Sequence, residues 1–246
     1  MKKVILKSFA LLGFCLFLLV IFLLNPSLLY AHQDTYKNLT IYHNGVFDEE
    51  LKEGIDLSLA KIESAKIYQK DFKSQLCLSD GSFYPKLVQK ILGDDVFTAF
   101  SNKVVVLGES SETFNHFHKW GQELRYDQFL SHALMHNLQF KHHGLWGANP
   151  LGNHPQWKWE GYVEYEVLGR ERSLESLVSL LQDAPQEDFD WVDLGEGEKT
   201  MKRHLEYLVL TKYCFDILNL SYDEFMKDER IEELLFTDVQ AWYYEL

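Results

Sequence analysis

The chain is poor in cysteine and proline. Of its 246 residues, three are cysteine and five are proline, which excludes a disulfide-built scaffold and a proline-rich linker. Cys15 lies in an apolar amino-terminal stretch, so Cys77 and Cys214 are the pair left in the body of the chain. Whether they form a disulfide stays open, because that depends on how close the fold brings them.

Positive charge is also scarce. The formal net charge is −13, and it becomes −16 when Lys2, Lys3 and Lys7 are left out. A protein that follows a phosphate backbone needs clustered lysine and arginine, so no nucleic acid is expected as a partner. Apolar residues make up 46% of the chain and aromatic residues 15%, which is ample for one packed domain.

The amino terminus carries a long apolar run. Three lysines precede an uncharged stretch from Ser8 to Leu24, and a second apolar stretch ends at Ala31. This length is short for a membrane-spanning helix and long for the core of a signal peptide. Residues 1–31 are therefore expected to be either a cleaved signal peptide or an N-terminal membrane anchor. The basic start predicts that residues 32–246 are extracytoplasmic, secreted or anchored, and meet a membrane only through this segment.

Hydrophobic periodicity predicts strands early in the body and helices later. The expected strands are 38–42, 75–78 and 103–107. The expected helices are 49–64, 83–92, a long segment from 122, 157–169, 202–218 and a segment from 222, with loops at 144–155 and 183–197. Ser221 and Glu224 have the spacing of a capping box. The predicted fold is α+β, with a small mixed sheet and N-terminal helices followed by a mainly helical C-terminal part.

Two histidines one helical turn apart suggest a metal site. His132 and His136 interrupt an otherwise apolar helix at i and i+4, so their imidazoles project from one face. An unpaired imidazole there would cost roughly 1–3 kcal/mol in desolvation. Glu160 comes from the next predicted helix and could supply a third ligand. Its neighbour Gly161 allows two helices to approach closely.

The same region resembles the active-site region of the gluzincins, the thermolysin-like class of zinc metallopeptidases. The resemblance runs from Phe129 to Tyr165 and is carried best by Pro155-Gln156-Trp157-Lys158-Trp159-Glu160-Gly161-Tyr162-Val163-Glu164-Tyr165. It implies a zincin-like domain over residues 32–246 and a Zn²⁺ ion held by His132, His136 and Glu160. It also implies that Glu164 orients one of the imidazoles. The alternative for Glu164 is an ordinary solvated or ion-paired carboxylate.

The resemblance breaks at one position. Gluzincins carry a glutamate directly after the first histidine as their general base, whereas this chain has Ala133. A positioned acid–base group typically contributes about 10²–10⁴-fold to the rate. The leading hypothesis is therefore a zinc-binding pseudoenzyme that acts by holding a peptide or protein in its cleft.

Two alternatives stay open. One is an active zinc-dependent hydrolase with a relocated base, and the other is a metal-free structural or interaction module. For the relocated base, Glu123, His142, His143 and His154 flank the motif in sequence, and Tyr126 and Tyr162 could hydrogen-bond an oxyanion.

Overall fold

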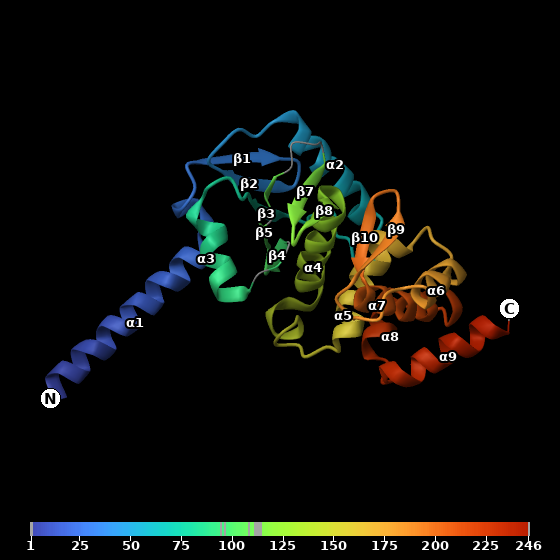
Figure 1. Ribbon diagram of the computed structural model, residues 1–246. Helices are drawn as coiled ribbons and strands as arrows, with labels where there is room; N and C mark the ends of the chain where they lie inside the picture. Colours follow the sequence, from blue (N-terminus) through green and yellow to red (C-terminus); the bar gives the residue numbers. More distant parts are fainter. Residues whose placement is uncertain (1, 94, 96, 108, 111–114, 246) are drawn as a thin grey trace.

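The fold is α+β and is built around a mixed sheet (Figure 1). The computed structural model describes residues 2–93, 95, 97–107, 109–110 and 115–245. The five strands of the main sheet are β1 (His32–Tyr36), β2 (Leu39–His43), β3 (Ser74–Cys77), β4 (Phe97–Phe100) and β5 (Lys103–Val106). Their order is β1-β2-β3-β5-β4. The middle three run parallel, and β1 and β4 pair antiparallel at the two edges.

Alternation along the strands gives this sheet two apolar faces. Ile41, Leu76 and Val104 belong to the main core of the molecule. Their chain neighbours Tyr42, Cys77 and Val105 point the other way and form a second, smaller core. Both faces need a cover, and the two helices that connect the parallel strands supply it.

Helix α2 (Glu49–Glu63) covers the first face and α3 (Phe83–Leu92) covers the second. Helix α2 begins after Asp48, whose side chain accepts a hydrogen bond from the Leu51 amide at 2.9 Å. Its apolar residues then recur at helical spacing and are buried in the main core. Helix α3 contributes Tyr84 and Val88 to the second core.

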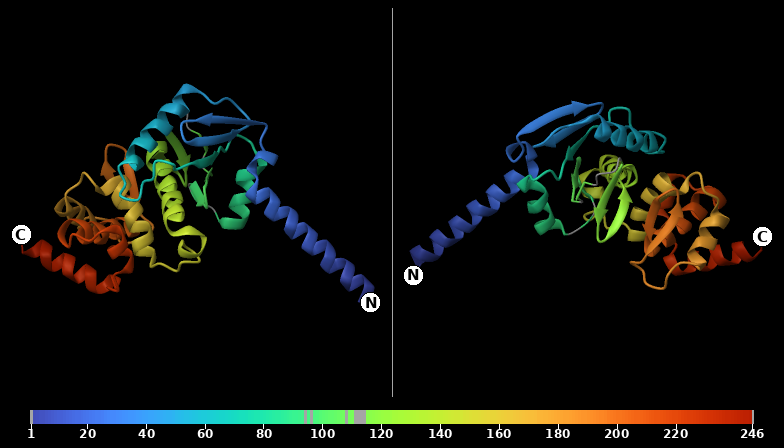
Figure 2. Two further views of the ribbon diagram at one scale, coloured as in Figure 1. Left: turned by 180° about the vertical axis from the view of Figure 1, so that it is seen from behind. Right: turned by 45° about the horizontal axis from the view of Figure 1, so that its top comes forward.

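Helix α4 (Tyr126–Gly147) packs against α2 and the edge strand β4. It is kinked at Gly144, where a φ of 70° turns the chain. The remaining helical elements gather on the other side of α4 from the sheet, as Figure 2 shows from two directions. They are α5 (Gln156–Glu164), the π-helical turn η2 (Tyr165–Gly169), α6 (Leu174–Gln182), α7 (Lys202–Lys212), the π-helical turn η3 (Tyr213–Ile217), α8 (Tyr222–Lys227) and α9 (Glu232–Tyr244).

The sequence predicted most of these elements within a few residues. The three expected strands and the helices over 49–64, 83–92, 157–169 and 202–218 are present. The capping box is confirmed, because Ser221 and Glu224 exchange both expected hydrogen bonds at the start of α8. Cys77 and Cys214 are both buried and free, so the body has no disulfide between them.

The sequence prediction missed helix α6 (Leu174–Gln182) and several short antiparallel strands. The long helix expected from Gln122 begins at Tyr126, and residues 122–125 are a strand instead. The acidic loop expected at 183–197 contains another strand, in which Val192 and Leu194 are buried alternately. These strands are β6 (Glu109–Ser110), β7 (His116–Lys119) and β8 (Gln122–Arg125) in one small sheet, and β9 (Trp191–Gly195) and β10 (Glu198–Met201) in a hairpin.

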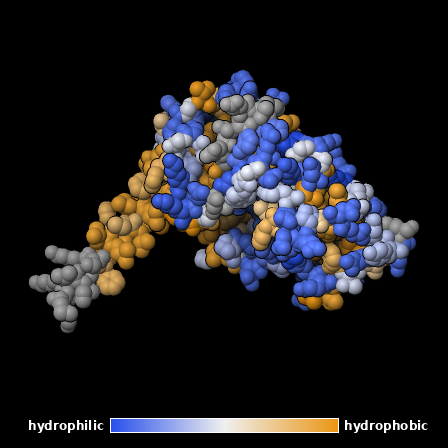
Figure 3. All heavy atoms as spheres, in the orientation of Figure 1, coloured by the Kyte–Doolittle hydropathy of each residue, from blue (hydrophilic) through white to orange (hydrophobic). Residues whose placement is uncertain are grey.

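The amino-terminal helix α1 (Lys2–Leu24) projects away from the body and is followed by the short 3₁₀ turn η1 (Pro26–Leu28). Figure 3 shows that the coloured part of α1 is largely hydrophobic, whereas the body is mostly hydrophilic on the same face. In the part of the chain that the structure describes, no helix combines the length and the apolar character needed to cross a membrane.

Candidate metal centre

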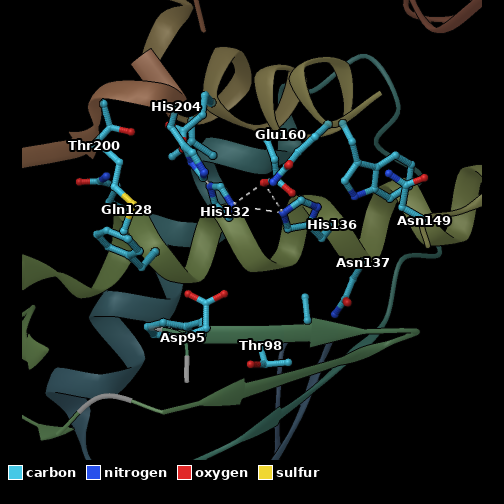
Figure 4. Close-up of a pocket in the computed structure, with 18 of the residues that line it drawn as sticks. Asp95, Thr98, Gln128, His132, His136, Asn137, Asn149, Glu160, Thr200 and His204 are labelled. Atoms are coloured by element: carbon cyan, nitrogen blue, oxygen red, sulfur yellow. Dashed lines mark hydrogen bonds and ion pairs between the residues drawn. The ribbon is translucent and has the colours of Figure 1, made fainter. Parts of the chain in front are cut away.

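Helices α4 and α5 bring the three predicted ligands together. His136 Nε2 lies 3.1 Å from His132 Nε2 and 3.1 Å from Glu160 Oε2, and His132 Nε2 lies 3.4 Å from the same oxygen. Figure 4 shows the three side chains converging from the two helices. Among the described residues, this is the group of histidine, cysteine and carboxylate side chains that could hold a metal ion.

The triangle of donor atoms is small enough for one metal ion to contact all three atoms. Zn²⁺ bonds to imidazole nitrogen and carboxylate oxygen are about 2.0–2.1 Å long, so the edge of a tetrahedron of such ligands is about 3.3 Å. The three observed separations, 3.1, 3.1 and 3.4 Å, fall around that edge. The two imidazoles and the carboxylate could therefore share one metal ion.

A close helix–helix contact sets the position of Glu160. A Cβ atom on Gly161 would lie 2.3 Å from Thr211 Oγ1 and 2.7 Å from the Tyr207 carbonyl oxygen of α7. Only glycine fits at that distance, so α5 lies directly against α7. The expectation that Gly161 permits close helix packing is confirmed. As a result, Glu160 faces α4 from a rigid support.

Gln139 fixes the orientation and the tautomer of His136. Its Oε1 lies 3.0 Å from His136 Nδ1, and its Nε2 donates to the Trp159 carbonyl oxygen at 2.9 Å. The bond to a carbonyl defines which end of the amide is the acceptor, so His136 Nδ1 must be the donor. His136 Nε2 is thereby directed towards His132 and Glu160.

Glu164 holds two imidazoles at once. Its Oε1 lies 3.4 Å from His132 Nδ1 and 2.8 Å from Nδ1 of His204, a residue of α7. The carboxylate is 4% exposed. The rings of His132 and His204 are stacked, with centroids 6.0 Å apart and an interplanar angle of 15°. Glu164 is therefore placed to orient His132, as expected, and it orients His204 as well.

Strong mutual electrostatics keep these buried groups ionised. Burial alone would raise the pKa of Glu164, but hydrogen bonds from His132 and His204 hold it at about 2. Burial also opposes the charge on His132, but the bonds with Glu160 and Glu164 raise its pKa to about 10. The pKa of Glu160 is well below its ordinary value because the two imidazoles outweigh its burial. The two carboxylates thus favour a positive charge on His132.

The centre lies on the wall of a cavity of about 530 Å³. Edge strand β4 forms the opposite side, as the position of Thr98 in Figure 4 shows, and the hairpin β9–β10 contributes Thr200 and Met201. Much of the remaining lining is aromatic: Phe97, Phe100, Trp120, Phe129, Phe140, Trp159 and Trp191. A cavity of this size with apolar walls and a few convergent polar groups is typical of a ligand site.

Helical periodicity places Ala133 beside the face of α4 that lines this cavity, but the alanine belongs to the main core and is not itself a lining residue. A helix turns about 100° per residue, so position 133 falls between His136 and Asn137, which both line the cavity. The alanine is 2% exposed and carries no ionisable atom. The residue directly after His132 therefore lies next to the lining residues and offers no acid or base.

None of the predicted replacement groups is among the lining residues of the cavity in the described part of the chain. His142 pairs with Asp223 at 3.2 Å, His143 with Tyr222 at 2.8 Å, and His154 with the Gly147 carbonyl oxygen at 2.8 Å. The hydroxyl groups of Tyr126 and Tyr162 are buried. Glu123 lies on β8 and is likewise outside the lining.

Sequence reasoning missed three polar residues of the site. Gln139 is one turn beyond His136, and its spacing of three residues was a usable signal. His204 and Asp95 come from distant segments and line the cavity from α7 and from the turn before β4. Nothing local marks them, because only the packing of α5 on α7 and of β4 on α4 brings them near.

Comparison of the chain with protein-family models, with curated proteins and with solved structures gives no match. The interpretation of the site therefore rests on its own residues and geometry.

Proposed function

We propose that the protein is an extracytoplasmic, zincin-like protein that holds Zn²⁺ through His132, His136 and Glu160 and binds an extended peptide or protein segment in the adjoining cavity. The observation that carries the proposal is the triangle of donor atoms with edges of 3.1, 3.1 and 3.4 Å on the wall of that cavity. Two imidazoles and a carboxylate with a free fourth position are the donor set of catalytic zinc sites. A zinc ion bound there would polarise a carbonyl group and acidify water.

The edge strand supports a peptide as the ligand. Strand β4 is the last strand of the main sheet among the described residues, so its outer backbone groups are not paired within that sheet. The residues from Phe97 to Ser101 line the same cavity as the metal centre. An extended chain can add to such an edge by main-chain hydrogen bonds, and the surrounding aromatic side chains would accept its alternate residues.

The alanine at position 133 supports binding rather than turnover. The proposed ligands His136 and His132 contact Gln139 and Glu164, which would orient them. What the site lacks is a carboxylate on the helix face beside His136. A general base typically raises the rate of a reaction about 10²–10⁴-fold. The defect lies in proton transfer, so metal binding and peptide binding are expected to be intact.

One observation favours the second candidate, an active hydrolase with a relocated proton-transfer group. The imidazole of His204 lines the cavity and is held at Nδ1 by Glu164, which is the imidazole–carboxylate pairing that many enzymes use for proton transfer. Figure 4 also places Asp95 on the β4 side of the cavity. This candidate predicts chelator-sensitive hydrolysis that His204→Ala abolishes without loss of zinc.

Metal content of the purified full chain tests the primary proposal. We expect about one zinc per chain and its loss in His136→Ala, with His142→Ala as a matched control because His142 is on the same helix but outside the site. The analysis should quantify iron as well, since two histidines and a carboxylate also serve Fe²⁺. Absence of bound metal in the natural chain, after incubation with zinc, would refute the proposal and favour a metal-free interaction module.

Peptide binding and hydrolysis decide between the two candidates. A library of short unstructured peptides, some rich in aromatic residues, can be screened against the zinc-loaded chain for both retention and cleavage. Retention without cleavage supports the primary proposal. Cleavage that a chelator stops would instead establish the hydrolase, and His204→Ala then shows whether that side chain transfers the proton.

A further inference from the structure

The segment that joins α1 to the body is part of the folded domain. We call residues 23–31 the collar. Tyr84 Oη donates to the Leu23 carbonyl oxygen at 2.7 Å, and Ser82 Oγ donates to the Leu29 carbonyl oxygen at 3.1 Å. Tyr30 Oη donates to the Leu78 carbonyl oxygen at 2.8 Å. Backbone groups of the collar are thus hydrogen-bonded to side chains of the body, and one of its own side chains reciprocates.

The collar also completes the second core. Leu23, Leu29 and Tyr30 pack against the small cluster on the α3 side of the sheet. The ring of Tyr30 lies with its centroid 6.0 Å from those of both Tyr42 and Tyr84. These contacts make the collar a structural layer, because without it buried aromatic rings of the body would meet water.

Cleavage after Ala31 would remove the whole collar. Tyr84, which is 0% exposed, would lose its hydrogen-bond acceptor and part of its cover. A signal peptide is normally dispensable once the protein has been exported. The packing of the collar is therefore unlike that of a removable leader.

Helix α1 exposes apolar side chains in every direction. Phe9, Leu11, Phe14 and Phe17 are 68%, 65%, 58% and 61% exposed. At about 100° per residue these four and Leu12, Leu16 and Val20 point around the full circumference of the helix. A groove on a protein would cover one stripe and leave the others in water, whereas hydrocarbon covers all sides.

We propose that the leader is retained in the mature protein and that α1 inserts into lipid without crossing the bilayer, with the collar as a fixed joint between the inserted helix and the body. The proposal does not depend on the metal centre, since none of its contacts involves the residues of that site. It selects the anchor over the cleaved signal peptide, and it specifies lipid as the occupant of the exposed surface of α1.

The mature amino terminus and its membrane attachment test this proposal. The full chain, with a tag after Leu246, is expressed in a bacterial host that processes signal peptides. Membranes are washed with alkaline carbonate and then extracted with detergent, and the intact mass of the protein is measured. We expect the mass of a chain that retains residues 1–31, found in the washed membranes. A chain that begins at His32, or an uncleaved chain that carbonate releases, would overturn the proposal.

A second measurement tests the collar itself. In detergent, Tyr84→Phe removes the hydrogen bond to Leu23 and keeps the ring, so we expect Tm to fall by roughly 2–4 °C. Tyr244→Phe is the matched control, because Tyr244 is 77% exposed near the other end of the chain, and its Tm is expected to be unchanged. Equal Tm values for the two variants would show that the collar is not a structural joint.

Discussion

Restoring a carboxylate at position 133 is the sharpest perturbation of the site. Ala133 lies about 60° around α4 from His136 and about 100° from His132, in the main core beside the residues that line the cavity. Glutamate extends two carbon atoms beyond the alanine methyl, so Ala133→Glu would direct a carboxylate into the space beside the three metal-holding side chains. If the missing base is what limits the protein, this one change should produce a peptidase.

The expected magnitudes can be set in advance. Position 133 is 2% exposed and packed in the main core, so overpacking by the larger side chain should by itself cost about 1–3 kcal/mol of stability, and any burial of the carboxylate adds to this cost. For a chain of this size that is a fall in Tm of roughly 2–12 °C. The gain in hydrolytic rate should be about 10²–10⁴-fold, which corresponds to a barrier lower by roughly 2.7–5.4 kcal/mol.

Ala133→Gln is the matched control, because glutamine has the shape of glutamate and cannot act as the base. The zinc-loaded natural chain and both variants are compared for cleavage of the same peptide pool, with zinc content measured in each. We expect turnover in Ala133→Glu alone, and its loss when His136→Ala is added. If Ala133→Glu holds one zinc per chain yet cleaves no faster than Ala133→Gln, the idea that Ala133 silences a gluzincin-like site is refuted.

Three further predictions concern the support of the site and the stability of the fold. Gln139→Leu should weaken zinc binding by about 10–100-fold, measured by competition with a chromophoric chelator, because His136 loses its orienting acceptor; unchanged affinity would contradict this role. Gly161→Ala should cost about 1–3 kcal/mol in the free energy of unfolding, since the new methyl group meets α7, and denaturant titration measures it. Burial lowers the pKa of His143 to about 4, below the value of about 6.5 in an unfolded chain. The folded state should therefore lose stability as the pH falls from 6.5 towards 4. His143→Gln should recover about 1–2 kcal/mol of that loss, discounted for partial exposure. If the fall in Tm between pH 7 and pH 4.5 is the same in His143→Gln as in the unchanged chain, this prediction is wrong.

The sequence alone predicts some parts of the fold and of the candidate site better than others. Helices α2 and α3 and the strand at Lys103–Val106 are strongly patterned, so periodicity located them closely. The hairpin at 191–201 escaped notice because its alternation is brief and is set among acidic residues. The strand at 122–125 was assigned to the following helix because its four residues are too few to show a period.

The metal centre was predictable where spacing along one helix encodes it. His132 and His136 share a helix face by periodicity alone, and the glutamate beside Gly161 is visible as a local motif. His204 could not be found in this way, because it lies 40 residues beyond Glu164, to which its Nδ1 is bonded. That proximity depends on how α7 packs against α5, and tertiary packing of this kind leaves no local trace in one sequence.

The orientation of both His132 and His204 depends on one carboxylate, that of Glu164. A change at Glu164 would free the imidazole on the metal side and, in the same step, the imidazole on the cavity wall. Neither ring can therefore be retuned through Glu164 while the other is left as it was. Variation that alters what the cavity accepts has to enter elsewhere, through the aromatic lining or the hairpin. We therefore expect His132 and His204 to be retained together or lost together.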